Sequence, residues 1–338
     1  MSNEVVRSVC YFTDNPNQQT VDKVNELEAK LVEKGYEVQT KRVCTPIADP
    51  IELQERVGDK TWLLCVGTLP FEQAVASLPK FYQADGVSFN VDLTSIPIDI
   101  PHTAPLFKII KNRPGVTFNF TYVFNNKPSS PYFPSANYAR NGFSIGLQPT
   151  DLAEDCSTLE EWLEKMKASW LRLDEMLGSD PDFLGIDSSI APIFEGKGSL
   201  INFIRRLEMS FSGSVTTNTY VRITQFMKEQ NPKPVGLCGL MMPCLEDFEL
   251  ADEYEGGNFS IERNVFLSLH SGLGIDTYPI GIDEDPKRVV EILRLVQALS
   301  QKYTKPLSVR FVSDGKAEIG QRTDFQNQYL KDVIVRPL

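Results

Sequence analysis

The sequence predicts an α/β protein, with a mostly parallel sheet or an α/β barrel, folded as a single domain over residues 1–338. Segments with the character of buried strands alternate with amphipathic helices along the whole chain, which is the pattern of β–α–β units. No stretch rich in Gly, Ser or Pro has the composition of a flexible linker. Hydrophobic residues make up 41% of the chain and charged residues 23%, which is typical of a globular protein.

The first elements form a β–α–β unit. Residues 5–12 (VVRSVCYF) have the composition of an apolar strand. Residues 21–35 place apolar side chains on one face of a helix, for which Thr20 is the expected N-cap. Residues 36–43 alternate like a strand, and residues 61–67 (TWLLCVG) are apolar enough for a strand that is buried on both faces.

A less regular stretch, rich in Pro and Asn, extends from Ile96 to Pro149. Within it we expect strands at residues 116–124 and 141–147, joined by an exposed loop over residues 125–140. The later helices are expected at residues 159–177, 199–211, 219–230, 264–272 and 286–303. The later strands are expected at residues 183–187, 275–280 and 307–312.

The charge balance limits the partners of the chain. A net charge of −11 disfavours a broad basic surface, so we expect no nucleic-acid partner and no binding to anionic membranes. No apolar run approaches the ~20 residues that a membrane-spanning helix needs. The N-terminus, MSNEVVRSVCYF, lacks the pattern of a signal peptide. We therefore expect a cytoplasmic protein whose partner is a small molecule.

Cysteine and histidine usage restricts the chemistry further. Six cysteines are scattered through mostly apolar segments, and none forms a CxxC pair. In a chain this large, the pattern indicates reduced, buried thiols rather than a disulfide framework. His102 and His270 are the two histidines, so a histidine-rich zinc or haem site is not expected.

The stretch GFSIG, residues 142–146, matches the G-x-S-x-G motif of serine hydrolases, with Ser144 at its centre. That motif needs a helix directly after the serine, and Pro149 would interrupt such a helix near its start. We therefore favour a buried strand in which the two glycines allow close backbone approach. A serine hydrolase that uses Ser144 and His270 is the alternative.

Two glycine-rich stretches fail as nucleotide-binding motifs. SGLGIDT has Thr277 where a dinucleotide fingerprint needs its third glycine, and FEGKGS lacks the glycine spacing of a P-loop. We therefore expect no nucleotide cofactor. Lys197, within FEGKGS, precedes a helix whose free N–H groups could hold an anion, although a surface turn capped by Ser199 explains it equally well. Lys197 and Arg140 are the candidates for substrate binding.

Acidic residues recur at the expected ends of strands. Asp187 follows FLGI, Asp276 lies at the edge of IDTYPI, and Glu246 and Asp247 follow GLCGLMMPCL. Ligands of α/β proteins bind at the carboxyl ends of strands. Carboxylates without histidines suit Mg²⁺ or Ca²⁺, so Asp187, Glu246 and Asp276 are candidate metal ligands. With Cys238 they are also the candidate catalytic residues, although each carboxylate alone is explained as well by a turn or a helix cap.

Several blocks together resemble the domain of unknown function 711 family. They are YFPSANYARNGFSIGL, GIDSSIAPIFEGKGS, GLCGLMMPCLED, SGLGIDTYP, KPLSVRFVSDGK and TDFQNQYL. The resemblance implies a ten-stranded α/β barrel like that of pyruvate formate-lyase, with a hairpin loop inside it. It makes residues 236–247 the candidate for that internal loop, whose glycines permit a tight turn. No counterpart of the glycyl radical domain is present, so radical chemistry is not implied.

The expected function is that of a cytoplasmic enzyme with a carboxylate–thiol centre inside the barrel, assisted by a hard divalent cation. The family resemblance supports the fold and names no reaction. Two alternatives stay open: a serine hydrolase that uses Ser144, and a non-catalytic protein that binds a small molecule or regulates a partner. The sequence is also compatible with a homo-oligomer.

Overall fold

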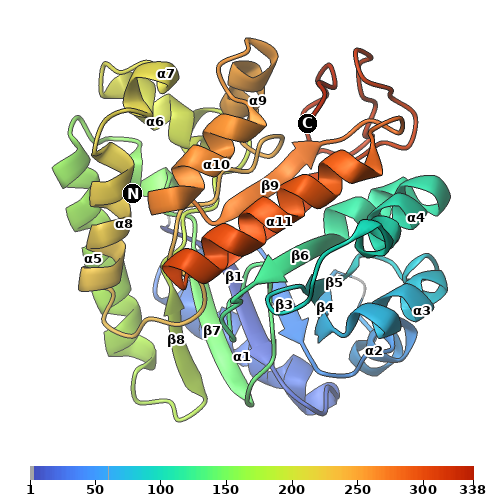
Figure 1. Ribbon diagram of the computed structural model, residues 1–338. Helices are drawn as coiled ribbons and strands as arrows, with labels where there is room; N and C mark the ends of the chain where they lie inside the picture. Colours follow the sequence, from blue (N-terminus) through green and yellow to red (C-terminus); the bar gives the residue numbers. More distant parts are fainter. Residues whose placement is uncertain (1–3, 60) are drawn as a thin grey trace.

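The structure is a computed structural model that describes residues 4–59 and 61–338. Ten strands of these residues form one sheet (Figure 1). Their bounds are β1 Glu4–Phe12, β2 Tyr36–Val38, β3 Lys41–Cys44, β4 Leu63–Leu69, β5 Val87–Asp92, β6 Phe120–Phe124, β7 Gly142–Leu147, β8 Phe183–Asp187, β9 Gly274–Pro279 and β10 Leu307–Val312. Nine strands follow the order β8-β7-β1-β3-β4-β5-β6-β10-β9, and β2 pairs with the first part of β1.

The sheet is mostly parallel, as predicted. Neighbouring strands run parallel from β1 through β3, β4 and β5 to β6, and within the pairs β7–β8 and β9–β10. The junctions β1–β7 and β6–β10 are antiparallel. The carboxyl ends of β8, β9 and β10 therefore lie at the same edge of the sheet as the amino ends of β1, β3, β4 and β5.

Helices cover the outside of the sheet. Their bounds are α1 Gln18–Glu33, α2 Pro50–Val57, α3 Phe71–Phe81, α4 Ala104–Asn112, α5 Leu159–Leu177, α6 Leu200–Arg206, α7 Phe211–Ser214, α8 Thr219–Gln230, α9 Phe248–Glu255, α10 Ile261–His270 and α11 Pro286–Tyr303. Figure 1 shows α2, α3 and α4 beside β4 and β5, α5 and α8 beside β8, and α11 across the front. The apolar faces of these helices pack on the sheet and form the main hydrophobic core. No helix of the described residues is both long and apolar enough to cross a membrane.

Local sequence patterns predicted the first and last residues of several helices and strands correctly. The expected helices 159–177, 219–230 and 286–303 and the expected strands 183–187 and 307–312 are confirmed with the same bounds. The first helix, however, begins at Gln18 rather than after Thr20. The Asn17 side chain accepts hydrogen bonds from the N–H groups of Gln19 and Thr20, and the Thr20 hydroxyl accepts from Asn17 N–H. Asn17 is therefore the N-cap of a capping box in which Thr20 is the third residue of the helix.

Long-range contacts altered other predicted elements. Residues 36–43 form two short strands, β2 and β3, which pair with successive parts of β1 in the same register. The expected helix 199–211 breaks into α6 and α7 at Glu208, which has a positive φ of 59°. The strand β5 (VSFNVD) and helices α2 to α4 were not predicted.

The segment 125–141, which joins β6 to β7, lies against β1, β3 and β5, which belong to four consecutive strands of the sheet order. Ser8 of β1 and Arg42 of β3 both donate to the Pro131 carbonyl at 3.1 Å. The Asn90 side chain of β5 donates to two further carbonyls of the segment, at 2.8 and 2.9 Å. Arg7 of β1 and Arg310 of β10 line one cavity although four strands lie between β1 and β10 in the sheet order, so the sheet is curled.

Because residues 125–141 contact β1, β3 and β5, the expectation of an exposed loop over 125–140 is wrong in its central part. Ser130, for example, is fully buried. The stretch 234–243 runs between β8 and β9. Four isolated parallel bridges hold it there: Ile186–Pro234, Ile190–Leu240, Leu240–Gly272 and Pro243–Asp276.

Candidate active site

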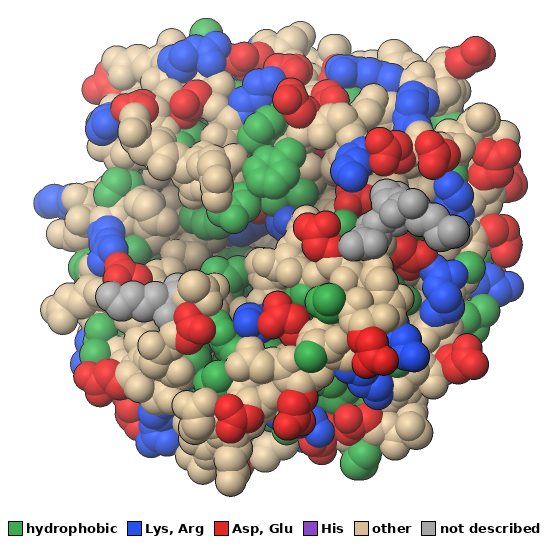
Figure 2. Space-filling model, turned by 180° about the vertical axis from the view of Figure 1, so that it is seen from behind, with side chains coloured by type: hydrophobic (Ala, Val, Ile, Leu, Met, Phe, Trp, Pro, Cys, Tyr) green, Lys and Arg blue, Asp and Glu red, His purple; other side chains and the backbone are tan. Residues whose placement is uncertain are grey.

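A cavity of about 540 Å³ lies at the edge where β8, β9 and β10 end. It opens on the face shown in Figure 2, where a hollow has apolar side chains along its rim and basic side chains inside it. The charged residues that line it are Arg7, Glu37, Arg42, Glu246, Asp276 and Arg310. Its volume lies within the range of small-molecule sites.

Arg310 of β10 is the centre of a buried ionic cluster. Its Nε donates to Asp276 Oδ1 of β9 and its Nη2 donates to Glu246 Oε2, each at 2.6 Å. The three side chains are at most 15% exposed. Although burial opposes its charge, the two carboxylates raise the pKa of Arg310. Two carboxylates thus share one cation, which leaves the cluster with a net negative charge when both are ionised.

Each carboxylate of the cluster keeps one oxygen free of protein partners. Glu246 Oε1 and Asp276 Oδ2 accept no hydrogen bond from the described residues, while their second oxygens are bound by Arg310. Burial raises the pKa of Glu246, and the nearby Asp276 carboxylate adds to the shift against the pull of Arg310. A carboxyl group with a raised pKa and a free oxygen in a cavity is suited to general acid–base chemistry.

Arg7 and Arg42 face the same cavity without a carboxylate partner. Arg42 donates to Pro131 O and to Thr40 Oγ1, and Arg7 donates to Gln39 Oε1 at 3.2 Å. Burial lowers the pKa of Arg42 to about 10, and the Arg7 guanidinium adds to the shift. Glu37, the third acid of the lining, is exposed.

These two arginines carry positive charge into the cavity without an ion-pair partner. Within residues 4–59 and 61–338, neither guanidinium forms an ion pair, although the two repel each other. Buried charges are normally paired, because an uncompensated charge away from water is unfavourable. An anionic ligand between them would supply the missing partner.

Aromatic side chains form the rim of the cavity. Phe194 and Tyr329 are 36% and 37% exposed, which is unusual for large apolar side chains, and their ring centroids are 5.6 Å apart. Phe118 lies nearly parallel to Tyr329 and also covers the Arg310 guanidinium. Phe194 has a positive φ of 61°, which a non-glycine residue rarely adopts. The rim can therefore bind the apolar part of a ligand whose charged group lies deeper.

Asp187 lies apart from this cluster and has a different role. It ends β8, is fully buried, and does not line the 540 Å³ cavity. Its carboxylate accepts hydrogen bonds from the hydroxyls of Ser130 and Ser189 and from the N–H groups of Ser189, Leu237 and Cys238. Asp187 thereby ties three chain segments together, and its acceptor capacity is largely used.

Cys238 lines a different, smaller hollow. Burial raises the pKa of its thiol to about 11, and the Asp187 carboxylate adds to the shift. The thiol donates to the Val235 carbonyl at 3.3 Å. A thiol in such surroundings stays protonated at neutral pH, whereas nucleophilic cysteines have a lowered pKa.

The residues present do not fit the expected hard cation. Among the described residues, no group of three or more His, Cys, Asp or Glu side chains is arranged to hold a metal ion. Glu246 and Asp276 share Arg310, while Asp187 is bound by hydroxyls and backbone N–H groups elsewhere. The predicted grouping of these three carboxylates is therefore corrected: the structure brings two of them together, and around an arginine.

The predicted substrate-binding residues lie outside the cavity. Arg140 is exposed, and Lys197 is exposed beside Glu154 at 4.0 Å; neither lines the 540 Å³ cavity. Ser144 is fully buried within β7, where it pairs with Cys10 and with Gly185. The strand interpretation of GFSIG is thus confirmed, because no strand-to-helix turn presents the serine.

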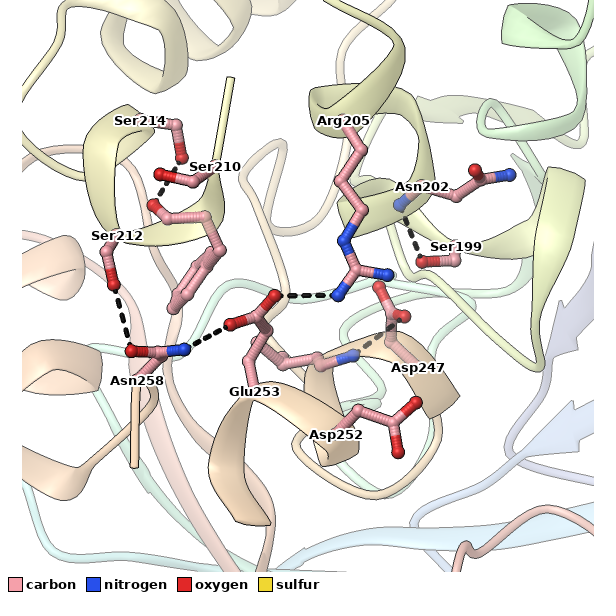
Figure 3. Close-up of polar contacts among 12 residues, drawn as sticks. Ser199, Asn202, Arg205, Ser210, Ser212, Ser214, Asp247, Asp252, Glu253 and Asn258 are labelled. Atoms are coloured by element: carbon pink, nitrogen blue, oxygen red, sulfur yellow. Dashed lines mark hydrogen bonds and ion pairs between the residues drawn. The ribbon is translucent and has the colours of Figure 1, made fainter. Parts of the chain in front are cut away.

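Asp247, the second acid of the PCLED stretch, joins two helices. It is the N-cap of α9, accepting from the Leu250 N–H, and it also accepts from the Leu200 N–H at the start of α6. Figure 3 shows the neighbouring polar contacts, in which Glu253 of α9 accepts from Arg205 of α6. The acidic run 246–253 is thus mostly used for helix caps and helix-to-helix ion pairs.

The cavity contains arginines that the sequence analysis did not single out. Arg7 in VVRSVCYF and Arg310 in LSVRFV each interrupt a mostly apolar strand, whereas Arg42 lies in the more polar segment YEVQTKRV. A charged residue in a strand that is otherwise buried is rarely placed there by packing alone. This pattern is the signal that could have identified Arg7 and Arg310.

Comparison with known proteins places the chain in a family. The model of the family described as Uncharacterised ACR (DUF711) matches residues 87–326, which include Glu246, Asp276 and Arg310 but not Arg7 or Arg42. No curated protein matches the sequence. Because the match covers more than half of the chain, the chain belongs to this family.

Proposed function

We propose that this member of the DUF711 family is an enzyme that acts on a small anionic molecule in the 540 Å³ cavity. The proposal rests on one observation. Arg7 and Arg42 have no carboxylate partner among the described residues, yet they line the same cavity as the Glu246–Arg310–Asp276 cluster. Such a site combines binding groups for an anion with groups that can transfer a proton.

In the proposed mechanism, the guanidinium groups of Arg7 and Arg42 bind the anionic group of the substrate. Arginine presents its donors in a planar fork that matches the oxygens of a carboxylate or phosphate. The apolar part of the substrate contacts the aromatic rim, which includes Phe194 and Tyr329. Binding then neutralises the positive charges of the buried Arg42 and the partly exposed Arg7, which favours an anion over a neutral analogue.

Glu246 transfers the proton in this mechanism. Its free oxygen, Oε1, takes a proton from the substrate or returns one to it, while Arg310 fixes the orientation of the carboxylate through Oε2. The raised pKa of Glu246 brings its proton affinity closer to neutral pH, where general catalysis is most effective. No step requires a thiolate or a metal ion.

Thermal shifts with a panel of small carboxylates and phosphate esters would test the binding step. We expect a subset to raise the melting temperature of the wild-type protein, because ligands that bind only the folded state stabilise it. Arg42→Gln and Arg7→Gln should abolish that effect. Arg140→Gln and Lys197→Gln serve as matched controls, because they remove exposed positive charges outside the cavity. Equal losses in all four variants would indicate a diffuse charge effect and sink the proposal.

The catalytic step needs a separate measurement. A compound from that panel that is consumed by the wild-type protein, as followed by mass spectrometry, should still bind Glu246→Gln. Its turnover should fall by roughly 10²- to 10⁴-fold, the usual contribution of a general acid or base. Binding without turnover in the wild-type protein would favour the non-catalytic alternative, in which the same cavity senses or carries the ligand.

For the fold, we propose closure into a ten-stranded barrel similar to that of pyruvate formate-lyase. The four isolated bridges that link residues 234–243 to β8 on one side and to β9 on the other support this. The hydrogen bonds of residues 125–141 to β1, β3 and β5 support an internal loop. An experimental structure in which residues 234–243 do not bridge β8 to β9 would contradict it.

A further inference from the structure

A second hollow, of about 210 Å³, lies at the other end of the sheet. Two of its lining residues lie just before strands: Leu273 directly precedes β9, and Lys305 lies close to the start of β10. Asp276 and Arg310, which line the first cavity, lie further along these two strands. Cys238 and the backbone of residues 236–239 form another part of its wall. The hollow is therefore distinct from the cavity to which the proposed function belongs.

Three lysines and no carboxylate line this second hollow. They are Lys127, Lys228 and Lys305. In the part of the chain that the structure describes, none of them forms an ion pair, although the protein carries a net charge of −11. Thr224 and Ser271 complete the lining, and their hydroxyls form hydrogen bonds with the Tyr220 carbonyl and with His270 Nδ1, respectively.

Lys305 is the partly buried member of the group, whereas Lys127 and Lys228 are exposed at the margin of the hollow. The Lys305 Nζ donates to the Ser268 carbonyl at 2.9 Å, which leaves two N–H donors. Burial lowers the pKa of Lys305 to about 8, and the Lys228 charge adds to the shift. Burial also lowers the pKa of His270, and repulsion by Lys305 adds to that shift. An anion in the hollow would relieve this repulsion.

We propose that this hollow binds the phosphate group of a small phosphorylated molecule. A phosphate dianion carries enough charge to pair with more than one ammonium group, and its oxygens accept from several lysine donors together. Lysines bind phosphate as point charges, in contrast to the planar arginine forks of the first cavity. The small volume restricts the ligand to a compact molecule.

Inorganic phosphate is the probe for this site, and it is added to the full-length protein. Sodium chloride keeps the ionic strength constant across the phosphate titration. We expect phosphate to raise the melting temperature of the wild-type protein in a saturable manner. Its apparent affinity should fall about tenfold in Lys305→Gln and in Lys228→Gln, since a charge-assisted hydrogen bond contributes about 1.5–3 kcal/mol. Lys228 is exposed, so its substitution does not put the fold at risk.

Two variants outside the hollow separate this site from others. Arg42→Gln, in the first cavity, and Lys197→Gln, on the surface, should keep the phosphate response. A response that is lost in Arg42→Gln but kept in both lysine variants would assign phosphate to the first cavity and overturn this proposal, while leaving the proposed function intact. A response that is absent from the wild-type protein, or equal in all variants, would also overturn it.

Discussion

The carboxylate of Asp187 accepts hydrogen bonds from five donors, two of them the consecutive backbone N–H groups of Leu237 and Cys238. It also limits the space around Gly236, where a Cβ atom would lie 2.3 Å from Asp187 Oδ2. The glycines of GLCGLMMPCLED therefore have a local cause. The chain must pass close to a buried carboxylate, and Gly236 does so with a φ of +72°.

Asp187→Asn should destabilise the protein rather than leave it unchanged. The two carboxylate oxygens of Asp187 now accept separately from the N–H groups of Leu237 and Cys238. An amide has one acceptor oxygen, so the NH₂ group of the asparagine would face one of these N–H groups and leave it without an acceptor. An unsatisfied buried donor costs about 1–3 kcal/mol, measurable by urea unfolding. Ser130→Ala is the control, because it removes one donor and should cost only about 1 kcal/mol. Equal stability of Asp187→Asn and the wild-type protein would contradict the assigned role.

Cys238 should react slowly with thiol reagents in the folded protein. With its pKa raised to about 11 by burial, roughly one thiol in a thousand is ionised at pH 8. All six cysteines are free and buried, so Ellman's reagent should titrate six thiols only after unfolding in guanidinium chloride. A fast phase in the native protein that disappears in Cys238→Ser would restore Cys238 as a candidate nucleophile.

Among the helices and strands, those that depend on a local sequence pattern were predicted, whereas those that depend on long-range contacts were not. Helix α5 was predicted with its correct bounds, because its apolar period lies within one continuous segment. Residues 36–43 were predicted as one strand, whereas β2 and β3 are two short strands, each defined by its pairing with a different part of β1. The position of residues 125–141 likewise depends on partners such as Asn90 and Arg42. Composition alone made that segment look like a surface loop.

Asp247 links the starts of α6 and α9, and this contact should depend on pH. Burial raises the pKa of Asp247 to about 7, whereas an aspartate in an unfolded chain has a pKa of about 3.9. The folded state therefore holds the proton more tightly. The stability that this proton contributes is complete below about pH 4 and is lost as the pH rises to about 7.

Asp247→Asn cannot ionise, so it should lack this dependence. Relative to the wild-type protein, the free energy of unfolding of the variant should increase by on the order of 3 kcal/mol between pH 4 and pH 8. Urea unfolding at several pH values measures it. Asp252→Asn is the control, because Asp252 is half exposed and its substitution removes an ion pair with Lys331. Parallel pH profiles for Asp247→Asn and the wild-type protein would show that Asp247 is ionised throughout.

For the whole molecule, the order of the strands determines where the charged residues meet. Arg7 and Arg310 are about three hundred residues apart in the sequence, yet both line one cavity. Their strands are brought together only when the sheet curls. The sequence analysis suggested Glu246 and Asp276 but not their neighbour Arg310, which meets Asp276 because β9 and β10 pair in parallel. Sequence patterns could therefore suggest the carboxylates of the candidate site, whereas the grouping of its arginines around one cavity required the fold.

The single-domain prediction is tested best by limited proteolysis. The sheet contains strands from residues 4 to 312, and β7 and β10 pair with strands of the N-terminal part of the chain, so a cut between two halves should be rare. The first cut should not fall at residues 127–130, since Ser129 and Ser130 are buried and the Ser129 N–H is bound to the Asn137 carbonyl at 2.9 Å. Subtilisin should instead cut first within residues 316–322, where most side chains are exposed and the chain has no helix or strand. Mass spectrometry of the early products would then show one large fragment that lacks the C-terminal residues. Two stable fragments of similar size would contradict a single domain.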